Sequence, residues 1–456
     1  MTILISFKIN KILTNNLLML SLAQARVSLL QLYYHNKPIY NMSFDINVKG
    51  NLSIDLFNKS LNYLLIRYPE LRINVLLEND QIVKKYNSNE FNMQINYENN
   101  PLAESNFINN PFDISNDLLI KVLYLKNSNK MIFLFSDIII DGFTILIFFK
   151  ELQYIYNCLF NCIIPNYKNI SPPIINLNEN NLMFWKSLLN RSNQFQINVK
   201  TNTNTFDENR IHFNITNKNF TFIKSNLHKI TLFDYFTSTF NLLLFIMTRQ
   251  NQITIDTLLG GYNENNIGLF NDIALIPSNF NSLDISLSKF RELQTKMLLD
   301  IKEKKISLEF LSHKLEFNDL PNIRIHFEYS NKNTDKSLKF GDSILESNLY
   351  ENSSNQIRQL LTLNICEFKN KIECYFSYKK ECFDEKYINL LTEIYNELLT
   401  CRNFSLNDIV SKYQIQSYYS TIYNEKIDKR LISYSFAGNY PNIKYSEFKN
   451  ILDKIN

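Results

Sequence analysis

Residues 131–150 read MIFLFSDIIIDGFTILIFFK, and this stretch decides which folds are open to the chain. Asp137 and Asp141 lie four residues apart, with only three isoleucines between them. Two carboxylates in so apolar a segment are costly to remove from water unless other groups bind them. A transmembrane helix could have this length, but each central Asp would oppose insertion by roughly 2.5–3.5 kcal/mol. We therefore expect a buried part of a folded domain and no membrane span.

The stretch predicts a strand, a loop and a helix in succession. The strand is buried and ends near Ser136, a polar loop reaches Gly142, and a helix covers residues 143–159 with Thr144 near its start. Polar groups between a buried strand and a helix are where α/β proteins often place chemistry. A purely structural turn fits the same pattern, because Asp-Gly is typical of turns. Both interpretations stay open at this point.

Length and composition predict two core-forming units. The chain has 456 residues, of which 45% are hydrophobic, and it contains 35 Phe and 26 Tyr. This length exceeds one ordinary domain and supplies enough apolar side chains for two large cores. The net charge of +4 is spread without a basic stripe, so nucleic acid is not an expected partner.

The cysteines and the amino terminus predict a cytoplasmic protein without a metal centre. Six cysteines lack the spacing of a metal site, so free thiols in a reducing compartment are expected. Residues 8–25 contain two lysines and a short apolar run that ends in AQA, as a signal peptide does. However, the apolar run is short and Asn15-Asn16 interrupt the approach to it, which favours the cytoplasm.

Apolar periodicity alternates along the chain between the spacing of helices and that of strands. Helices are expected near residues 17–33, 52–66, 143–159, 231–248, 288–303 and 385–399. Strands are expected near residues 44–48, 73–77, 82–86, 93–97, 118–125, 131–135, 253–259, 322–330, 360–368 and 371–378. A polar connector with three prolines, residues 163–180, is the best domain boundary. Each half therefore predicts a mixed sheet with helices, an α+β fold.

Six short segments, spread over nearly the whole chain, carry a family resemblance. They are Ser21–Arg26 (SLAQAR), Tyr40-Asn41, Arg67–Arg72 (RYPELR), Pro111–Asp113, Phe184–Lys186 (FWK) and Ile267–Phe270 (IGLF). In order and spacing they resemble the motifs of nonribosomal peptide synthetase condensation domains, which are relatives of chloramphenicol acetyltransferase. The third segment departs from the family's R-H-x-x-L-R because Tyr68 replaces the histidine. One such segment would be weak evidence, but six in the family's order are strong.

The resemblance implies a fold of two chloramphenicol acetyltransferase-like halves, arranged as a V around a central tunnel. Residues 1–170 would form the N-terminal half, residues 171–408 the C-terminal half, and residues 409–456 a tail similar to the linker after condensation domains. The implied partners are peptidyl or acyl carrier proteins, whose phosphopantetheine arms enter the tunnel from opposite faces. No cofactor would be bound by the domain itself.

The family's His-His-x-x-x-Asp-Gly loop corresponds to Ser136–Gly142, which keeps the Asp-Gly but lacks both histidines. In the family the second histidine contacts the attacking amine, as base or as positioner, and the Asp is structural. The resemblance therefore implies that Asp137 takes the catalytic position beside Ser136, and that Asp141 before Gly142 is structural. An aspartate has an ordinary pKa near 3.9, so it needs burial to act as a base near neutrality.

Two further positions are weak substrate-binding candidates by the same resemblance. Asp272 corresponds to the Asn after I-G-x-F, and Tyr262 corresponds to an Arg that often pairs with the motif Asp. The five histidines, at positions 35, 212, 228, 313 and 326, form no H-x-x-x-D pattern. We expect them to be ordinary surface or core residues.

The altered loop leaves two classes of function open. The first is an enzyme that forms an amide or ester between carrier-bound substrates, acting in trans because no adenylation or carrier domain follows the tail. The second is an inactive module that docks carrier proteins or recruits a tailoring enzyme. A cyclisation-type domain is a further alternative, although its D-x-x-x-x-D motif has four residues between the carboxylates and this chain has three.

Overall fold

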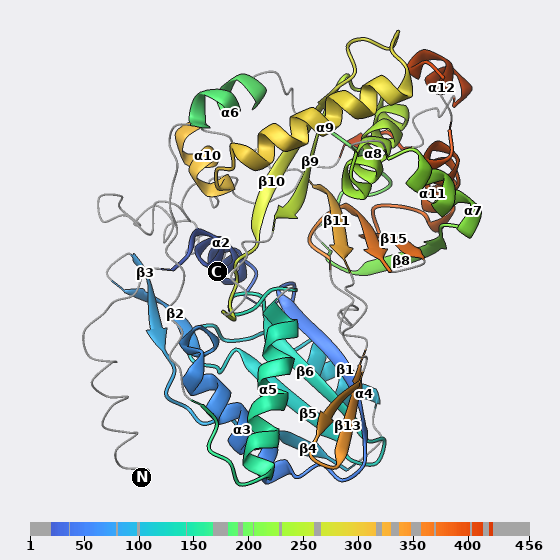
Figure 1. The fold of residues 1–456 in the computed structure, drawn as a ribbon. Coiled ribbons are helices and arrows are strands. Elements are labelled where there is room, and N and C mark those ends of the chain that lie inside the picture. The colour runs from blue at the N-terminus through green and yellow to red at the C-terminus, as the bar shows by residue number, and fades with distance from the viewer. Residues whose placement is uncertain are drawn as a thin grey trace.

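A computed structural model describes most of the chain in two lobes. The described residues are 20–35, 37–78, 81–97, 101–142, 144–166, 181–189, 195–203, 205–227, 230–259, 266–315, 322–329, 337–347, 357–368, 371–401, 404–413 and 419–422. Each lobe contains one six-stranded sheet, and Figure 1 shows α2 (Leu22–Tyr33) and the ends of β9 (Gln252–Leu259) and β10 (Asp272–Asn279) between the lobes. The α+β class expected from the sequence is confirmed.

The first sheet has six strands in the order β12-β13-β1-β6-β5-β4. Their bounds are β1 (Asn41–Lys49), β4 (Gln94–Asn96), β5 (Ile120–Leu125), β6 (Lys130–Ser136), β12 (Ser337–Phe340) and β13 (Ser343–Ser347). Two helices, α3 (Ile54–Arg67) and α5 (Thr144–Phe160), pack together over one face of this sheet. The ring of Phe133 in β6 lies 6.0 Å from Phe57 of α3 and 4.9 Å from Phe149 of α5, centroid to centroid. Aromatic packing thus buries β6 and the face of α5 that follows it.

The second sheet also has six strands, in the order β10-β9-β11-β14-β15-β8. The bounds of those not yet given are β8 (Glu208–Asn214), β11 (Ile323–Tyr329), β14 (Leu361–Glu367) and β15 (Ile372–Lys379). β11 runs parallel to β9 and β14, and the other pairs are antiparallel. Helices α8 (Leu232–Thr248) and α11 (Glu385–Leu399) cover one face, where Phe376 lies 6.1 Å from Phe240 and 6.0 Å from Tyr395. The opposite face turns away from these helices.

The remaining elements complete the lobes. They are η1 (Pro69–Arg72), β2 (Ile73–Glu78), β3 (Gln81–Tyr86), α4 (Pro101–Ile108), α6 (Leu182–Leu189), β7 (Asn198–Val199), α7 (Asn217–Ser225), α9 (Leu287–Glu303), α10 (Leu308–Leu315), α12 (Leu406–Lys412) and β16 (Thr421–Ile422). The prediction for residues 131–150 is confirmed, because β6 ends at Ser136 and α5 begins at Thr144.

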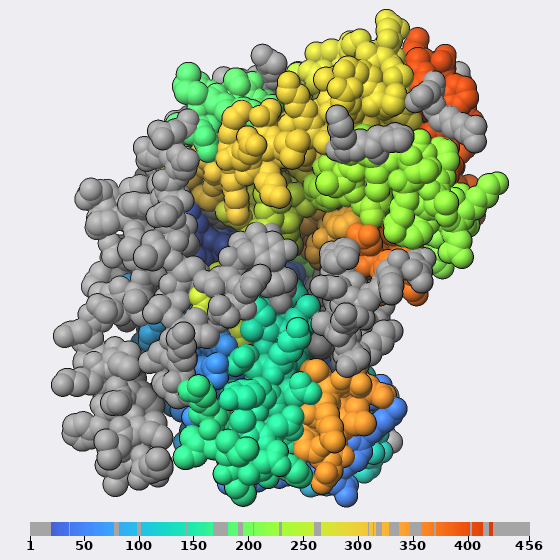
Figure 2. Space-filling model, viewed as in Figure 1, coloured from blue at the N-terminus to red at the C-terminus, as the bar shows by residue number. Residues whose placement is uncertain are grey.

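The hairpin β12–β13 connects the two lobes. Although it lies after β11 in the chain, it joins the first sheet through β1, where Val48 is opposite Leu345 and Ile46 is opposite Ser347. Figure 2 shows the hairpin, in orange, packed beside α5 on the first lobe. Lys49 adds an ion pair of 2.7 Å to Glu346 across the same strands. The first sheet is thus completed by residues from late in the sequence.

The predicted domain limits lie partly outside the described residues. Residues 167–180 of the expected connector and residues 423–456 of the expected tail are not described. The division at residues 170 and 171 and the limits of the tail therefore stay predictions. None of the helices within the described ranges is long and apolar enough to cross a membrane.

Candidate active site

The loop after β6 leaves from the middle of the first sheet. β6 has β1 on one side and β5 on the other. The last hydrogen bonds run from the amide of Ser136 to the carbonyl of Leu119, 3.0 Å, and from the amide of Asp137 to the carbonyl of Tyr40, 2.9 Å. Residues 138–140, the three isoleucines, are fully buried. The centre of the loop is therefore enclosed by the lobe.

Asp141 begins helix α5 with a reciprocal cap. Its Oδ1 accepts a hydrogen bond of 2.9 Å from the amide of Thr144, and Thr144 Oγ1 accepts one of 3.1 Å from the amide of Asp141. The carbonyl of Asp141 accepts from the amide of Ile145, 3.0 Å, as the first bond of the helix. This arrangement satisfies amides that a helix otherwise leaves unpaired at its start.

The same carboxylate binds a segment of the second lobe. Asp141 Oδ2 accepts from the amides of Phe270, 2.9 Å, and Asn271, 3.1 Å. Thr144 Oγ1 donates to the carbonyl of Gly268, 2.8 Å. A Cβ atom on Gly268 would lie 2.7 Å from the Phe270 ring, so a side chain there would displace the ring. The structure thus brings together two segments that are 129 residues apart in the chain.

Asp137 has the opposite environment from Asp141. Its Oδ1 is buried and has no hydrogen-bond partner among the described residues, although the residue as a whole keeps some exposed surface. Burial raises the pKa of this carboxyl from 3.8 to about 7, the Arg324 charge lowers the pKa, and the Asp141 charge raises it. A carboxyl with a pKa near neutrality can accept and return a proton at physiological pH.

The neighbouring loop positions have smaller roles. Ser136 is buried, and its Oγ accepts from the amide of Ile138 at 3.4 Å, a contact within the turn. Gly142 is exposed, and a Cβ atom there would meet nothing within 4 Å, so space alone does not require glycine. Neither residue contacts the Asp137 carboxylate through a described hydrogen bond.

A buried polar network is hydrogen-bonded to the loop after β6. Lys84 Nζ lies 2.6 Å and 2.8 Å from the two carboxylate oxygens of Glu70, and these side chains are only 4% and 10% exposed. Gln24 Nε2 donates to Glu70 Oε2 at 3.0 Å and to the carbonyl of Ile138 at 3.4 Å. The network therefore connects β3 to the residue that follows Asp137.

Sequence reasoning missed this network, although a signal was present. Side chains alternate along a strand, so Ile82, Lys84 and Tyr86 lie on the same face of β3. This pattern indicated that a lysine points toward an apolar core. A charge in that position needs a buried partner. Gln24 belongs to the segment that resembles the family's opening motif, which places that motif against the loop.

The second lobe contributes a fixed cation. Arg324 Nε donates to Asp256 Oδ1 at 2.5 Å, and Arg324 Nη2 donates to Asp256 Oδ2 at 3.1 Å. This bidentate salt bridge joins the parallel strands β9 and β11. His326 lies two residues further along β11. Burial, and then the Arg324 charge, lower the pKa of His326, and a hydrogen bond with Asn364 raises it. His326 is therefore a neutral imidazole near pH 7.

The two weak substrate-binding candidates have different outcomes. Asp272 begins β10, and its Oδ2 lies 3.6 Å from Lys305 Nζ, in a partly exposed ion pair. Its side chain therefore already has a cationic partner. Tyr262, together with residues 260–265, lies outside the described residues. Both positions stay predictions.

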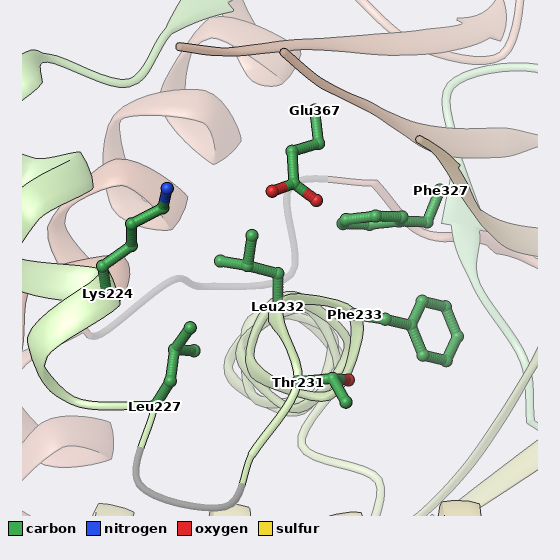
Figure 3. Close-up of a pocket in the computed structure, with 7 residues that line it drawn as sticks. All are labelled: Lys224, Leu227, Thr231, Leu232, Phe233, Phe327 and Glu367. Carbon is green, nitrogen blue, oxygen red and sulfur yellow. The ribbon is translucent and has the colours of Figure 1, made fainter. Parts of the chain in front are cut away.

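A separate cavity of about 470 Å³ lies on the helix-covered face of the second sheet. Figure 3 shows the residues that line it, which are Lys224, Leu227, Thr231, Leu232, Phe233, Phe327 and Glu367. Because side chains alternate along β11, Phe327 points to the opposite face from His326. The cavity is therefore not part of the Asp137 site. In the described ranges, no group of three or more His, Cys, Asp or Glu is placed to hold a metal ion.

Comparisons with known proteins show the family and the fold of the chain. The family model described as Condensation domain matches residues 14–420. No curated protein matches the sequence. Among solved structures, the complex of the X-domain and OxyB from teicoplanin biosynthesis gives a TM-score of 0.77 at 12% identity, covering 87% of this chain and 96% of that one. A variant of the starter condensation domain of rhizomide synthetase, in complex with C8-CoA, gives a TM-score of 0.67 at 13% identity. The match covers 85% of this chain and 96% of that one.

A larger assembly is also similar. A four-domain nonribosomal peptide synthetase bound to AMP and glycine gives a TM-score of 0.69 at 17% identity, covering 86% of this chain. This chain spans only 33% of that synthetase. At these identities the solved structures show a shared fold.

Proposed function

The chain belongs to the condensation-domain family, and from this premise we propose that it joins two carrier-bound substrates by an amide or ester bond. One carrier protein would present an acyl or aminoacyl thioester and the other an amine. In the reaction the nitrogen attacks the thioester carbonyl, a C–N bond forms and the C–S bond breaks. Asp137 would take the proton from the nitrogen and return it to the departing thiolate of phosphopantetheine.

The observation that carries this proposal is the environment of Asp137. By its resemblance to the family motif, the carboxylate would take the catalytic position. Its Oδ1 is buried without a partner among the described residues, and burial raises its pKa to about 7. Histidine suits this chemistry because its ordinary pKa is near 6.5. A desolvated aspartate with a similar pKa can perform the same proton transfer. Ser136 is engaged in the turn, and Asp141 in backbone hydrogen bonds.

The wider setting is proposed on the same basis. We infer a V of two acyltransferase-like halves with a tunnel between them, entered by phosphopantetheine arms of carrier proteins that act in trans. Condensation domains need no cofactor of their own. A cytoplasmic location fits such partners. Asp272 and Tyr262 stay weak candidates for substrate contacts, and of these Asp272 already has Lys305 as a partner.

A second candidate is a module without catalytic activity that recruits a tailoring enzyme or docks carrier proteins. Two observations favour it. Both catalytic histidines of the family motif are absent. The similar X-domain was solved in complex with OxyB, so this fold is known in a complex with another protein. A cyclisation role is disfavoured, because Asp141 is held by three backbone amides and is not free to act.

An assay with loaded donor and acceptor carrier proteins, followed by intact-mass analysis, tests the proposal. Asp137→Asn keeps size and polarity but removes the basic oxygen, so condensation should fall by about 10²–10⁴-fold. Ser136→Ala is the matched control and should cost far less. Asp137→His partly restores the family motif and should keep or raise activity. If wild type and all three variants are equally inert with several substrates, the docking module replaces the enzyme.

A further inference from the structure

Asp137 is the second residue of a tight four-residue turn. The amide of Ile139 donates to the carbonyl of Ser136 at 3.1 Å, which closes the turn over Asp137 and Ile138. The amide of Asp137 donates to the carbonyl of Tyr40 at 2.9 Å, and the amide of Ile138 donates to Ser136 Oγ at 3.4 Å. The direction of the Asp137 side chain therefore depends on how the backbone of this turn is held.

Helix α2, which lies between the lobes in Figure 1, supplies a further donor to this turn. Gln24 Nε2 donates to the carbonyl of Ile138, the residue after Asp137, at 3.4 Å. Gln24 and Ile138 are 3% and 0% exposed. A buried carbonyl that loses its donor also lacks ready access to water, so the loss of this bond is costly. The bond therefore connects the start of α2 to the turn that carries Asp137.

The side-chain amide of Gln24 is fixed at both of its ends. Its Oε1 accepts from the amide of Ser21 at 3.0 Å, and Ser21 Oγ accepts from the amide of Gln24 at 3.0 Å, as the reciprocal cap of α2. Its Nε2 also donates to Glu70 Oε2 at 3.0 Å. Lys84 Nζ in turn lies 2.6 Å and 2.8 Å from the two oxygens of Glu70. These partners direct Nε2 at the carbonyl of Ile138, because the opposite orientation of the amide would break the bonds at both ends.

We propose that Gln24 is a positioning residue for the carboxylate of Asp137. It binds the turn one residue beyond Asp137, and the cap of α2 and the buried ion pair keep its amide in one orientation. The role rests on the proposed function of Asp137, because Gln24 acts on the backbone of the turn and not on the substrates. A catalytic group that is misplaced by about 1 Å can lose about 10²-fold in rate. Loss of Gln24 should therefore lower kcat and leave KM nearly unchanged.

The test replaces Gln24 by methionine, which has a similar length but no amide. Gln31→Met is the matched control, because Gln31 lies on the same helix, is 4% exposed, and donates to the carbonyl of Lys37, outside the turn. With loaded donor and acceptor carrier proteins, Gln24→Met should lower kcat by about 10–100-fold and change KM by less than about threefold. Gln31→Met should change neither. In the Asp137→Asn background, Gln24→Met should cause no further loss, because the group that it positions is gone.

A second readout needs no catalysis. Hydrogen exchange followed by mass spectrometry reports on the amides of Ile138 and Ile139, which both donate to Ser136 within the turn. These amides should exchange roughly tenfold faster in Gln24→Met than in wild type or in Gln31→Met. Gln24→Asn is the second variant if Gln24→Met does not fold. It keeps a polar amide but is one methylene shorter, so it should reproduce both effects.

The outcomes separate the positioning role from the enzymatic function. Equal kcat and equal exchange for the folded Gln24 variants and Gln31→Met overturn the proposal. An equal loss of kcat with and without the Asp137 carboxylate also overturns it, because Gln24 then does not act through Asp137. If exchange in the turn rises but wild type performs no condensation, the hold on the turn stands and the enzymatic function fails. If condensation depends on Asp137 but not on Gln24, the enzymatic function stands and the positioning role fails.

Discussion

Replacing Asp141 by alanine should destabilise the protein far more than replacing Asp137. The Asp141 carboxylate accepts hydrogen bonds from the amides of Thr144, Phe270 and Asn271, at 2.9, 2.9 and 3.1 Å. Hydrogen bonds to a charged group contribute about 1.5–3 kcal/mol each. The helix-capping share of the loss is about 1 kcal/mol. In the Asp141→Ala variant, all three amides lose their hydrogen-bond acceptor.

The size of the effect depends on how far water can replace the carboxylate. The amides of Phe270 and Asn271 are part-buried, whereas that of Thr144 is buried. Partial hydration keeps the sum toward its lower limit, so we expect a loss of roughly 3–5 kcal/mol in the free energy of unfolding. Asp137→Ala removes a carboxylate whose Oδ1 has no described hydrogen bond and whose ionisation is opposed by burial, so near pH 7 it should not lower the free energy of unfolding.

Urea denaturation of both variants near pH 7, followed by circular dichroism, checks this prediction. Asp141→Asn is an intermediate control, because it keeps one acceptor oxygen but loses the charge. The expected order of stability is Asp137→Ala, then Asp141→Asn, then Asp141→Ala. Equal losses for the two alanine variants, or a larger loss for Asp137→Ala, would refute the view that Asp141 holds the two segments together.

Asp137→Asn should be as stable as wild type near pH 4 and more stable at pH 8, by a difference on the order of 4 kcal/mol. The folded-state pKa of Asp137 is raised to about 7 from 3.8, so wild-type stability is full below pH 4 and is lost as the pH rises through 7. If wild type and Asp137→Asn have equal urea midpoints at pH 8, this prediction is contradicted. Lys84→Met should cost roughly 3–5 kcal/mol, because it leaves Glu70 as a buried anion, and Lys84→Met/Glu70→Leu should recover most of the loss. A double variant that is no more stable than Lys84→Met alone would show that the ion pair is not the cause.

Local features of the site were predictable from the sequence. The apolar run before Ser136 and the Asp-Gly pair predicted where β6 ends and where α5 begins, because strand burial and turn chemistry are encoded within a few residues. Burial of Asp137 was a condition for basicity stated from the residue types alone. The acceptor role of Asp141 was implied by the family resemblance. Its donors, Phe270 and Asn271, are distant in the chain and came only with the structure.

The contacts between strands that are distant in the sequence were not predictable in this way. A strand was expected near residues 322–330, but no local signal pairs Arg324 with Asp256, which is 68 residues earlier. His326 was expected to be an ordinary surface or core histidine. No local sequence pattern indicated that the guanidinium of Arg324 lowers the pKa of this imidazole. The pairing of β13 with β1 likewise depends on tertiary packing. Periodicity predicts which face of a strand is apolar, but not which distant strand lies beside it.

That pairing has a consequence for synthesis on the ribosome. One edge of β1 pairs with β6, which is synthesised soon after it. The other edge pairs with β13, where Val48 is opposite Leu345, and β13 is synthesised much later. At about 5–20 residues per second, the ribosome needs roughly 15–60 s to make the chain between them. During that interval the nascent first lobe carries an open strand edge, the feature that recruits other chains into aggregates. A chaperone that shields this edge should therefore raise the yield of folded protein more than one that acts after release.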